Sequence, residues 1–573
     1  MVKIDYSQKV GRLKQTVKTS LRLFGLLWEI DKWLLFSNTI VMTISALIPF
    51  VFAYVFKLLI DQVVGIVSGD RPDFNIIVGL FIAGFVVYTV QSLSFSAQDY
   101  LSRLLYTKVP ISLYQKVLVK VSGLDMAYFE DSEFKNILEK VKDSYAWRPL
   151  NMMENLLFAF QSLIQVVTAV VVLTALAPIL ILIILVVAVP ELISRIKESE
   201  LSWGIWDARS PFRKKFWYVS SLLQERDSVK EMKLYQLPRK FLDELQGIHE
   251  NLYQENKTLA TRYLGFHTVF SFLGGIIFIG ILLFIILEAI ARRITVGDIS
   301  YYTTVITNLQ NGIGGLFRNI VKLFSESLYV SSLFEVLDAS PKVLPPQNPQ
   351  QLVLKKAPTI QFKGVTFTYQ GSARAVLDNF NLTIKPGEKI ALVGENGSGK
   401  TTIIKLLCRF YDVDEGEILV NGVNLKELDL NDWYKATGVL FQDFVKYEYK
   451  VWENIHFGKA DSKKNFKNII EAAVSSGADP MIKKLDKGYE QMLGRTFEDG
   501  IELSAGQWQK MALARGFLRD AKVLILDEPT SAIDAKAESE IFNRVEKLSK
   551  DKTVIIISHR FSTVRNADKI YVI

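Results

Sequence analysis

Long runs of apolar residues, separated by basic and polar segments, fill the first half of the chain. An α-helix needs about 20 mostly apolar residues to cross a bilayer. The run from Leu156 to Pro190 carries no charge and would measure roughly 50 Å as one helix, so we divide it near Ala177-Pro178 into two spans. Polar residues interrupt the last run, which makes it the weakest. The predicted spans are residues 34–60, 76–95, 156–177, 178–190, 264–287 and 299–317.

Before the first span, residues 17–33 form a basic segment with apolar side chains three and four residues apart, at Val17, Leu21, Phe24 and Trp28. This spacing predicts an amphipathic helix. Such a helix either lies in the membrane interface or packs as an ordinary helix, and this stretch alone favours neither.

The distribution of basic residues predicts the orientation. The N-terminal segment and the long loops 97–150 and 194–262 are rich in Lys and Arg, whereas loop 61–75 holds one Arg and three Asp. Lys and Arg are enriched on the cytoplasmic side, so we expect the N-terminus and both long loops to be cytoplasmic. Because the basic residues lie mainly in loops between apolar spans, the net charge of +8 indicates a membrane protein rather than a nucleic-acid partner. The single cysteine, Cys408, excludes an internal disulfide and is predicted to be a small buried hydrophobe.

The long cytoplasmic loops each contain a break in the helical pattern, at residues 129–134 (FEDSEF) and 224–229 (QERDSV). Each break is either a surface that touches a partner or an ordinary turn between helices. Polar side chains at membrane depth call for a functional hypothesis because burying them in lipid is costly, although hydrogen bonding between helices is the better explanation of each one taken alone. These side chains are Gln161, Gln165, Glu191, His267 and Asn308.

After a polar linker at residues 338–358, strand-like and helical runs alternate, which predicts an α/β domain with a largely parallel sheet. There GENGSGKT (residues 394–401) follows a strand-like run at 389–393 and precedes a helical run. This is the phosphate-binding loop pattern in its strand–loop–helix context. Its glycines let backbone N–H groups converge on phosphate oxygens. Lys400 adds a positive charge between the β- and γ-phosphates, and the Thr401 hydroxyl is placed to hold Mg²⁺.

Two further strand-like runs end in groups suited to phosphate chemistry. Residues 523–526 lead to Asp527 and Glu528, of which one can hold Mg²⁺ and the other can polarise the attacking water. The strand predicted at 553–557 leads to His559. Ligands of open α/β sheets bind at the carboxyl ends of strands, so we expect these groups to lie near the phosphate-binding loop.

The ordered motifs GENGSGKT, Gln442, LSAGQ (503–507), LILDE (524–528), SAID (531–534) and His559 resemble those of an ATP-binding cassette (ABC) domain. Together with the six spans, they make nearly the whole chain resemble a half-size ABC exporter. The resemblance implies a membrane all-α six-helix transmembrane domain followed by an α/β P-loop NTPase domain. The corresponding limits are 1–337 for the transmembrane domain, 338–358 for the linker and 359–573 for the nucleotide-binding domain, which looks truncated at its C-terminus.

The resemblance also implies roles. Two cassettes would close head to tail around two ATP molecules, Glu528 would be the catalytic base, and the breaks at 129–134 and 224–229 would be coupling helices that dock on the cassettes. Tyr369 would stack on adenine, although it is equally typical of an ordinary sheet aromatic. The implied catalytic residues are Glu528, His559 (at the γ-phosphate) and Gln442 (sensing Mg²⁺ and the transmembrane part). The implied metal-binding residues are Thr401, Gln442 and Asp527. The implied ATP-binding residues are Tyr369, Gly394, Asn396, Gly397, Ser398, Gly399, Lys400, Thr401 and Thr402, with Ser504, Gly506 and Gln507 from the signature motif, where Ser504 and Gly506 act in trans.

Two features depart from the family pattern. Ala505 stands where the signature usually has glycine, which is costly if the backbone there needs a positive φ or a very close approach to phosphate, and mild otherwise. The chain also ends at Ile573, inside a strand-like run.

The function that we expect is ATP-driven export of an amphipathic small molecule, lipid or peptide out of the cytoplasm across the plasma membrane, by alternating access as a dimer. ATP binding would favour an outward-open state and hydrolysis would reset it. Lipid flipping is an alternative within transport, and an ATP-gated channel or regulator is an alternative outside it, which an intact Glu528 argues against. A homodimer is the simplest assembly, and a heterodimer stays open. About 33 residues precede the first span and contain no cysteine, so a leader-cleaving cysteine peptidase is not expected, which disfavours peptide export without excluding it.

Overall fold

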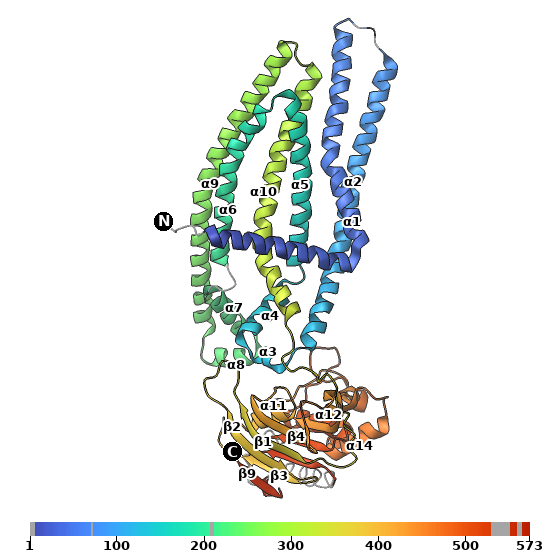
Figure 1. Cartoon of the computed structure of the whole chain (residues 1–573), viewed down its shortest axis with the longest axis vertical. Helices are drawn as coiled ribbons and strands as arrows, with labels where there is room; N and C mark the ends of the chain where they lie inside the picture. Colours follow the sequence, from blue (N-terminus) through green and yellow to red (C-terminus); the bar gives the residue numbers. More distant parts are fainter. Residues whose placement is uncertain are drawn as a thin grey trace. The chain divides into compact units, whose positions relative to one another are not determined.

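The chain divides into two compact units, drawn in Figure 1. The computed structural model describes residues 6–69, 71, 73–206, 211–528, 551–558, 564–565 and 567–573. The first unit comprises residues 1–122 and 136–339, and the second comprises residues 123–135 and 340–573. A short piece of the long loop 97–150 therefore belongs to the second unit, although it is flanked in sequence by the helices of the first.

The first unit is helical. Five helices in the described part of the chain are long and apolar enough to cross a membrane, namely α1, α2, α5, α6 and α9. They contain the first five predicted spans, and the division near Pro178 is where α5 ends and α6 begins. The weak run at 299–317 lies within α10, a continuous helix that is not one of these five. The helices are α1 (Tyr6–Val67), α2 (Phe74–Ser122), α4 (Ser132–Ser144), α5 (Arg148–Leu176), α6 (Ile179–Trp206), α7 (Pro211–Gln224), α8 (Arg226–Leu234), α9 (Pro238–Ile290) and α10 (Val296–Asp338).

Helix α1 consists of two helices joined at Asp31, whose backbone is extended (φ −159°, ψ 93°). The Asp31 carboxylate accepts a hydrogen bond from the backbone N–H of Leu34 at 3.0 Å, which is how an N-cap residue starts a new helix. Figure 1 shows the N-terminal piece lying across the long helices of this unit. Its predicted apolar stripe points outward, with Leu21 69% exposed, whereas Leu23 and Leu27 on the other side are buried in the bundle. An exposed apolar stripe beside a packed face is typical of a helix in the membrane interface.

Helix α10 holds the bundle together by packing against α5 and α1. An ion pair supports this packing: the Arg148 guanidinium of α5 lies 3.0 and 3.1 Å from the two carboxylate oxygens of Glu326 on α10. Both side chains are mostly buried, and the guanidinium also stacks on the ring of Tyr329. Breaking one partner of such a pair would leave a buried charge uncompensated, so the contact fixes the register of the two helices.

Three of the polar side chains predicted at membrane depth have protein partners. His267 of α9 lies 2.9 Å from a carboxylate oxygen of Glu198 on α6, which is a contact between helices. Asn308 donates to the Thr304 carbonyl one turn earlier in α10. Glu191 pairs with a neighbour in its own helix and lines a cavity that is described below.

The second unit contains two sheets. A parallel sheet has the order β6-β7-β8-β3-β9, as the alternating pattern predicts, and an antiparallel sheet, which we did not predict, has the order β2-β1-β4-β5. The strands are β1 (Ile360–Phe367), β2 (Leu377–Ile384), β3 (Lys389–Val393), β4 (Glu415–Val420), β5 (Val423–Asn424), β6 (Thr437–Leu440), β7 (Val523–Asp527), β8 (Thr553–Ile557) and β9 (Lys569–Val572). The helices are α3 (Met126–Glu130), α11 (Lys400–Leu407), α12 (Leu430–Ala436), α13 (Val451–His456), α14 (Phe466–Ser476), α15 (Asp479–Ile482) and α16 (Ala505–Leu518).

Strands β7 and β8 are buried along their whole length, which explains why their sequences are continuous apolar runs rather than alternating ones. Helix α11 packs on this core, and Cys408 at its end is 3% exposed. Burial raises the pKa of the Cys408 thiol to about 12, so it stays protonated at neutral pH. The last strand, β9, pairs with β3 and so lies beside the strand that leads into the phosphate-binding loop.

Candidate functional site

The loop between β3 and α11 has the conformation that its glycines allow. Gly397 and Gly399 have φ angles of 84° and 101°, a region that glycine adopts without the steric cost of a side chain. Gly399 is the N-cap of α11, so the positive end of this helix faces the loop. The Lys400 ammonium donates hydrogen bonds to the carbonyls of Gly394 (3.0 Å) and Glu395 (2.7 Å), which holds the charge inside the curve of the loop.

A cavity of about 470 Å³ opens at this loop, where the carboxyl ends of β3, β7 and β8 meet. It collects ten of the predicted site residues, although they come from positions far apart in the chain. The ten are Tyr369, Asn396, Gly397, Gly399, Lys400, Thr401, Thr402, Gln442, Asp527 and Glu528, and Val376 and Ile557 complete the lining. The Tyr369 hydroxyl lies 3.1 Å from the hydroxyl of Thr402, which fixes the aromatic ring at one side of the cavity.

Glu528 is held in a strained conformation. Its φ is 45°, in the left-handed region that disfavours residues with a side chain, and such strain at a site costs about 1–3 kcal/mol. The backbone N–H donates to the Ile557 carbonyl at 3.0 Å, and Gln442 Nε2 donates to Glu528 Oε2 at 3.0 Å. Both side chains line the cavity, so the hydrogen bond from Gln442 holds the Glu528 carboxylate at its wall.

The oxygen atoms at this edge suit Mg²⁺, which prefers oxygen ligands and binds through one or two carboxylates together with phosphates of the substrate. Asp527 is 3% exposed and lies at the end of β7, and the Thr401 and Gln442 side chains line the same cavity. In the described part of the chain, no group of three or more His, Cys, Asp or Glu side chains could hold a metal ion without such a substrate. The donor set therefore fits a magnesium–nucleotide complex rather than a permanently bound metal.

The signature motif begins helix α16. Ser504 is its N-cap, and its hydroxyl accepts a hydrogen bond from the Gln507 N–H at 3.3 Å, while the Gln507 side chain accepts one from the Ser504 N–H. Ala505 is the first helical residue, and its φ is not positive. The first of the two conditions under which a methyl group would be costly, a positive φ, is thus not met. Ser504, Gly506 and Gln507 do not line the cavity, so within one chain the structure does not bring them together with the other predicted site residues. His559 and the SAID motif lie outside the described residues.

The sequence did not reveal that the Glu130 side chain of α3 contacts α11, the helix that follows the phosphate-binding loop. A Glu130 carboxylate oxygen lies 2.6 Å from the Lys405 ammonium, and the other oxygen accepts a hydrogen bond from the Tyr411 hydroxyl. The Lys405 ammonium in turn lies 5.3 Å from the ring centroid of Tyr369. Burial is the largest single effect and lowers the pKa of Lys405, but the hydrogen bond to Glu130 together with the other interactions with Glu130 and Tyr369 raises this pKa above its usual value. In the sequence, only the break in the helical pattern at 129–134 indicated a contact surface here, and it did not identify Lys405 or Tyr411 as the residues contacted.

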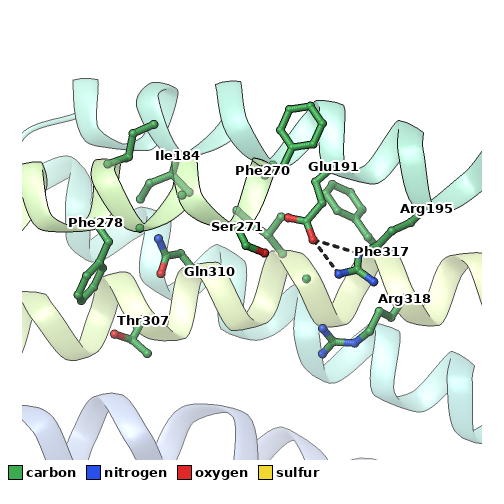
Figure 2. A pocket seen from close by; sticks show the side chains of 16 residues that line it. Ile184, Glu191, Arg195, Phe270, Ser271, Phe278, Thr307, Gln310, Phe317 and Arg318 are labelled. Carbon is green, nitrogen blue, oxygen red and sulfur yellow. Dashed lines mark hydrogen bonds and ion pairs between the residues drawn. The ribbon is translucent and has the colours of Figure 1, made fainter. Parts of the chain in front are cut away.

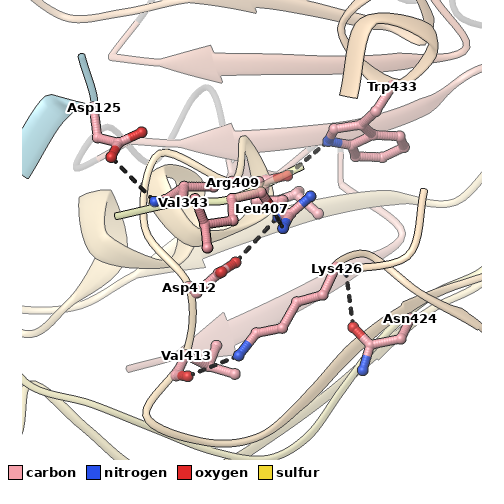
Figure 3. A network of polar contacts seen from close by, with 10 residues as sticks. Asp125, Val343, Leu407, Arg409, Asp412, Val413, Asn424, Lys426 and Trp433 are labelled. Carbon is pink, nitrogen blue, oxygen red and sulfur yellow. Dashed lines mark hydrogen bonds and ion pairs between the residues drawn. The ribbon is translucent and has the colours of Figure 1, made fainter. Parts of the chain in front are cut away.

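Hydrogen bonds also join the linker to the residues before α3 and after α11 (Figure 3). The Asp125 carboxylate accepts hydrogen bonds from the backbone N–H groups of Lys342 and Val343, the latter at 3.1 Å. The buried Arg409 guanidinium donates to the Leu344 carbonyl at 2.9 Å and to Asp412 at 3.1 Å. The segment around α3 therefore contacts the end of α11 directly and also through the linker.

Comparison with known proteins explains why these elements occur in one chain. Residues 35–203 match the family model for the ABC transporter transmembrane region, and residues 377–531 match the ABC transporter model. The subtilin transport ATP-binding protein SpaT of Bacillus subtilis is 30% identical over 98% of this chain and 90% of its own length. The chain belongs to the ABC transporter family. The nisin transport ATP-binding protein NisT of Lactococcus lactis is 26% identical over 96% of this transporter and 90% of its own length.

A flippase matches part of the chain, and a solved structure matches nearly all of it. The ATP-dependent lipid A-core flippase of Pasteurella multocida is 44% identical over 37% of this transporter and 36% of its own length. A solved bacterial Atm1-family ABC exporter with ATP bound has the same fold, with a TM-score of 0.76 and 20% identity over 94% of both chains. This transporter is therefore a half-size ABC exporter: a multi-pass membrane protein that binds and hydrolyses ATP, exports a substrate, and acts with a second half.

Proposed function

We propose that this transporter exports a peptide, and that it does so as a homodimer in the plasma membrane. Of the relatives described above, the two that match along nearly the whole chain are named for transport of subtilin and nisin, whereas the lipid A-core flippase matches over 37% of it. Whole-length similarity includes the membrane helices, which are the part that meets the cargo. It therefore favours a peptide over a lipid or a small molecule.

We propose the following roles at the nucleotide site. Lys400 and the loop N–H groups hold the phosphates of ATP, and Tyr369 stacks on the adenine ring. When Mg²⁺ is bound, it neutralises charge on the β- and γ-phosphates, and Thr401, Gln442 and Asp527 are the residues that hold it. Glu528 takes the proton of the attacking water as general base, and Gln442, hydrogen-bonded to it at 3.0 Å, keeps its carboxylate in place.

The remaining roles come from the second half of the dimer. Ser504 and Gly506 of one half complete the site of the other, because in one chain they lie outside the cavity lining. His559 contacts the γ-phosphate. We further propose that α10 supplies a sixth membrane crossing, that the nucleotide-binding domain begins near residue 359 and is cytoplasmic, and that the segment around α8 is the second coupling region.

The observation that carries the proposal is the convergence of Lys400, Glu528 and Gln442 on one cavity in a chain whose whole length resembles peptide exporters. It is tested with purified protein in proteoliposomes. ATP hydrolysis is measured with a panel of amphipathic peptides, lipids and small organic molecules, for the wild type, Glu528→Gln and a control, Glu417→Gln, whose carboxylate is exposed on β4.

We expect peptides, and not the other compounds, to stimulate hydrolysis and to be transported into the vesicles. Glu528→Gln should keep ATP binding and lose hydrolysis by about 10²-fold or more, the usual contribution of a general base. Stimulation by lipids alone would overturn the peptide assignment. If no compound changes the rate of hydrolysis and none is transported, the result would favour the ATP-gated channel or regulator.

A further inference from the structure

A cavity of about 450 Å³ lies between helices α6, α9 and α10 of the first unit (Figure 2). Its residues belong to the stretches 184–195, 270–278 and 307–318. These stretches fall largely within the predicted spans and reach their cytoplasmic ends. The cavity is thus at the depth where a transported compound passes, and it is separate from the nucleotide site.

The two ends of this cavity differ in polarity. Figure 2 shows Ile184 and Phe278 at one end and Glu191, Arg195 and Arg318 at the other. In the predicted orientation, α6 and α10 both run toward the cytoplasm. The charged residues come last in the lining stretches of these two helices, so the charged end of the cavity is the cytoplasmic end. A compound entering from the cytoplasm therefore meets charge first and an apolar surface behind it.

The charges do not cancel. Glu191 accepts hydrogen bonds from Arg195 Nε at 3.0 Å and Nη2 at 2.8 Å, so these two side chains of α6 neutralise each other. Arg318 of α10 has no hydrogen bond or ion pair within the described residues, and its side chain is exposed beside the cavity. The lining is left with one positive charge in excess.

A glycine on α10 makes room for the Arg318 guanidinium beside the cavity. A side chain at Gly314 would place its Cβ 3.3 Å from Arg318 Nη1, closer than most real contacts, so the glycine lets the guanidinium lie along the helix. Arg318 directly follows the predicted span 299–317 and its side chain is exposed, so its guanidinium is open to a ligand from the cytoplasm. A guanidinium binds a carboxylate through two parallel hydrogen bonds. The open partner position at Arg318 fits one carboxylate.

We propose that this cavity is the site where the cargo peptide docks, with a carboxylate on Arg318 and a neighbouring apolar side chain between Phe270 and Phe278. The proposal rests on the proposed function, because it takes the cargo to be a peptide. The Glu191–Arg195 pair offers no binding position for a second carboxylate, because the Arg195 guanidinium is already paired with Glu191. The site thus selects an isolated acidic group with apolar residues beside it.

The test uses a synthetic amphipathic peptide that stimulates ATP hydrolysis of the wild type in proteoliposomes, and the same peptide with every carboxylate converted to a carboxamide. The variants are Arg318→Gln, which removes the charge, and Arg318→Lys, which keeps it. The control is Arg103→Gln, an exposed arginine of α2 that pairs with Asp99 in its own helix. ATP affinity and the size-exclusion profile report whether each variant folds.

For the carboxylate peptide, we expect Arg318→Gln to raise the half-maximal concentration about tenfold or more, which corresponds to about 1.4 kcal/mol. Arg318→Lys should lie between Arg318→Gln and the wild type, and Arg103→Gln should match the wild type. The carboxamide peptide should have the same half-maximal concentration for the wild type and for Arg318→Gln. That value should equal the raised value of Arg318→Gln with the carboxylate peptide.

Two results would overturn the site while leaving peptide export intact: equal responses of the wild type to the two peptides, or equal responses of Arg318→Gln and Arg103→Gln to the carboxylate peptide. A different result would overturn the proposed function: no peptide stimulates, but vesicles containing an acidic phospholipid do. If that stimulation is also lost in Arg318→Gln, the anion at Arg318 is a lipid phosphate and not a peptide carboxylate.

Discussion

The Glu130 carboxylate and the Lys405 ammonium lie 2.6 Å apart although 275 residues separate them in sequence. Glu130 ends α3, and Lys405 is on the helix that follows the phosphate-binding loop. Because Lys405 also lies 5.3 Å from the centroid of the Tyr369 ring, the Lys405 side chain connects α3 to the aromatic ring proposed to stack on adenine. We therefore expect a displacement of α3 to change the affinity for ATP.

Replacing Glu130 by Gln tests this connection. The pair is 22% and 32% exposed, so its loss should cost about 0.5–1 kcal/mol and raise the half-saturating ATP concentration about 2–5-fold. Cargo-stimulated hydrolysis should fall by more than basal hydrolysis. Glu133→Gln is the matched control, because this exposed carboxylate lies three residues further along. Equal behaviour of the two variants would mean that the contact only supports the local structure.

Mixed dimers test whether Ser504 acts in trans. A homodimer of Ser504→Arg should lose most hydrolysis because the long side chain obstructs the partner's phosphate, and a homodimer of Glu528→Gln should lose it for lack of a base. A dimer with one half of each kind still contains one intact site if the halves meet head to tail. We expect it to recover about half of the wild-type rate by this counting of sites. No recovery would show that Ser504 acts on its own chain's ATP.

The variant Ala505→Gly should change little. Ala505 is the first residue of α16, exposed and without a positive φ, so the methyl group neither strains the backbone nor displaces a neighbour. Glycine in a helix is less favourable than alanine by up to about 1 kcal/mol, and we expect a slightly lower unfolding temperature of the nucleotide-binding domain. Because the substitution changes helix propensity and no contact in the nucleotide site, hydrolysis at saturating ATP should stay within about twofold of the wild type. A large gain would mean that the methyl group hinders the closed dimer.

Cys408 should not react with a maleimide in the folded protein, even at pH 8 to 9, because it is buried and its pKa is raised to about 12. The unfolded thiol titrates near 9.0, so the stabilisation from keeping it protonated is complete below that pH and is lost as the pH rises toward 12. Mass spectrometry after labelling with and without denaturant measures this. Fast labelling of the native protein would show that α11 opens readily.

Local patterns in the sequence determined the chemistry of the nucleotide site and the existence of the membrane helices. The phosphate-binding loop could be identified because its glycines, Lys400 and Thr401 are consecutive, and the spans could be identified because bilayer thickness sets their length. The buried strands β7 and β8 were equally clear, because a strand covered on both faces is a continuous apolar run.

Tertiary structure decided what depends on contacts between distant residues. The antiparallel sheet arises from pairings such as Ile360 with Val420, which no local spacing encodes. The apolar stripe of the N-terminal helix could be read from the sequence, but whether it faces the bundle or the outside depends on where Leu23 and Leu27 pack. The partner of Glu130 and the missing partner of Arg318 among the described residues were likewise invisible in the sequence, because a charge's environment is set by whatever the fold brings beside it.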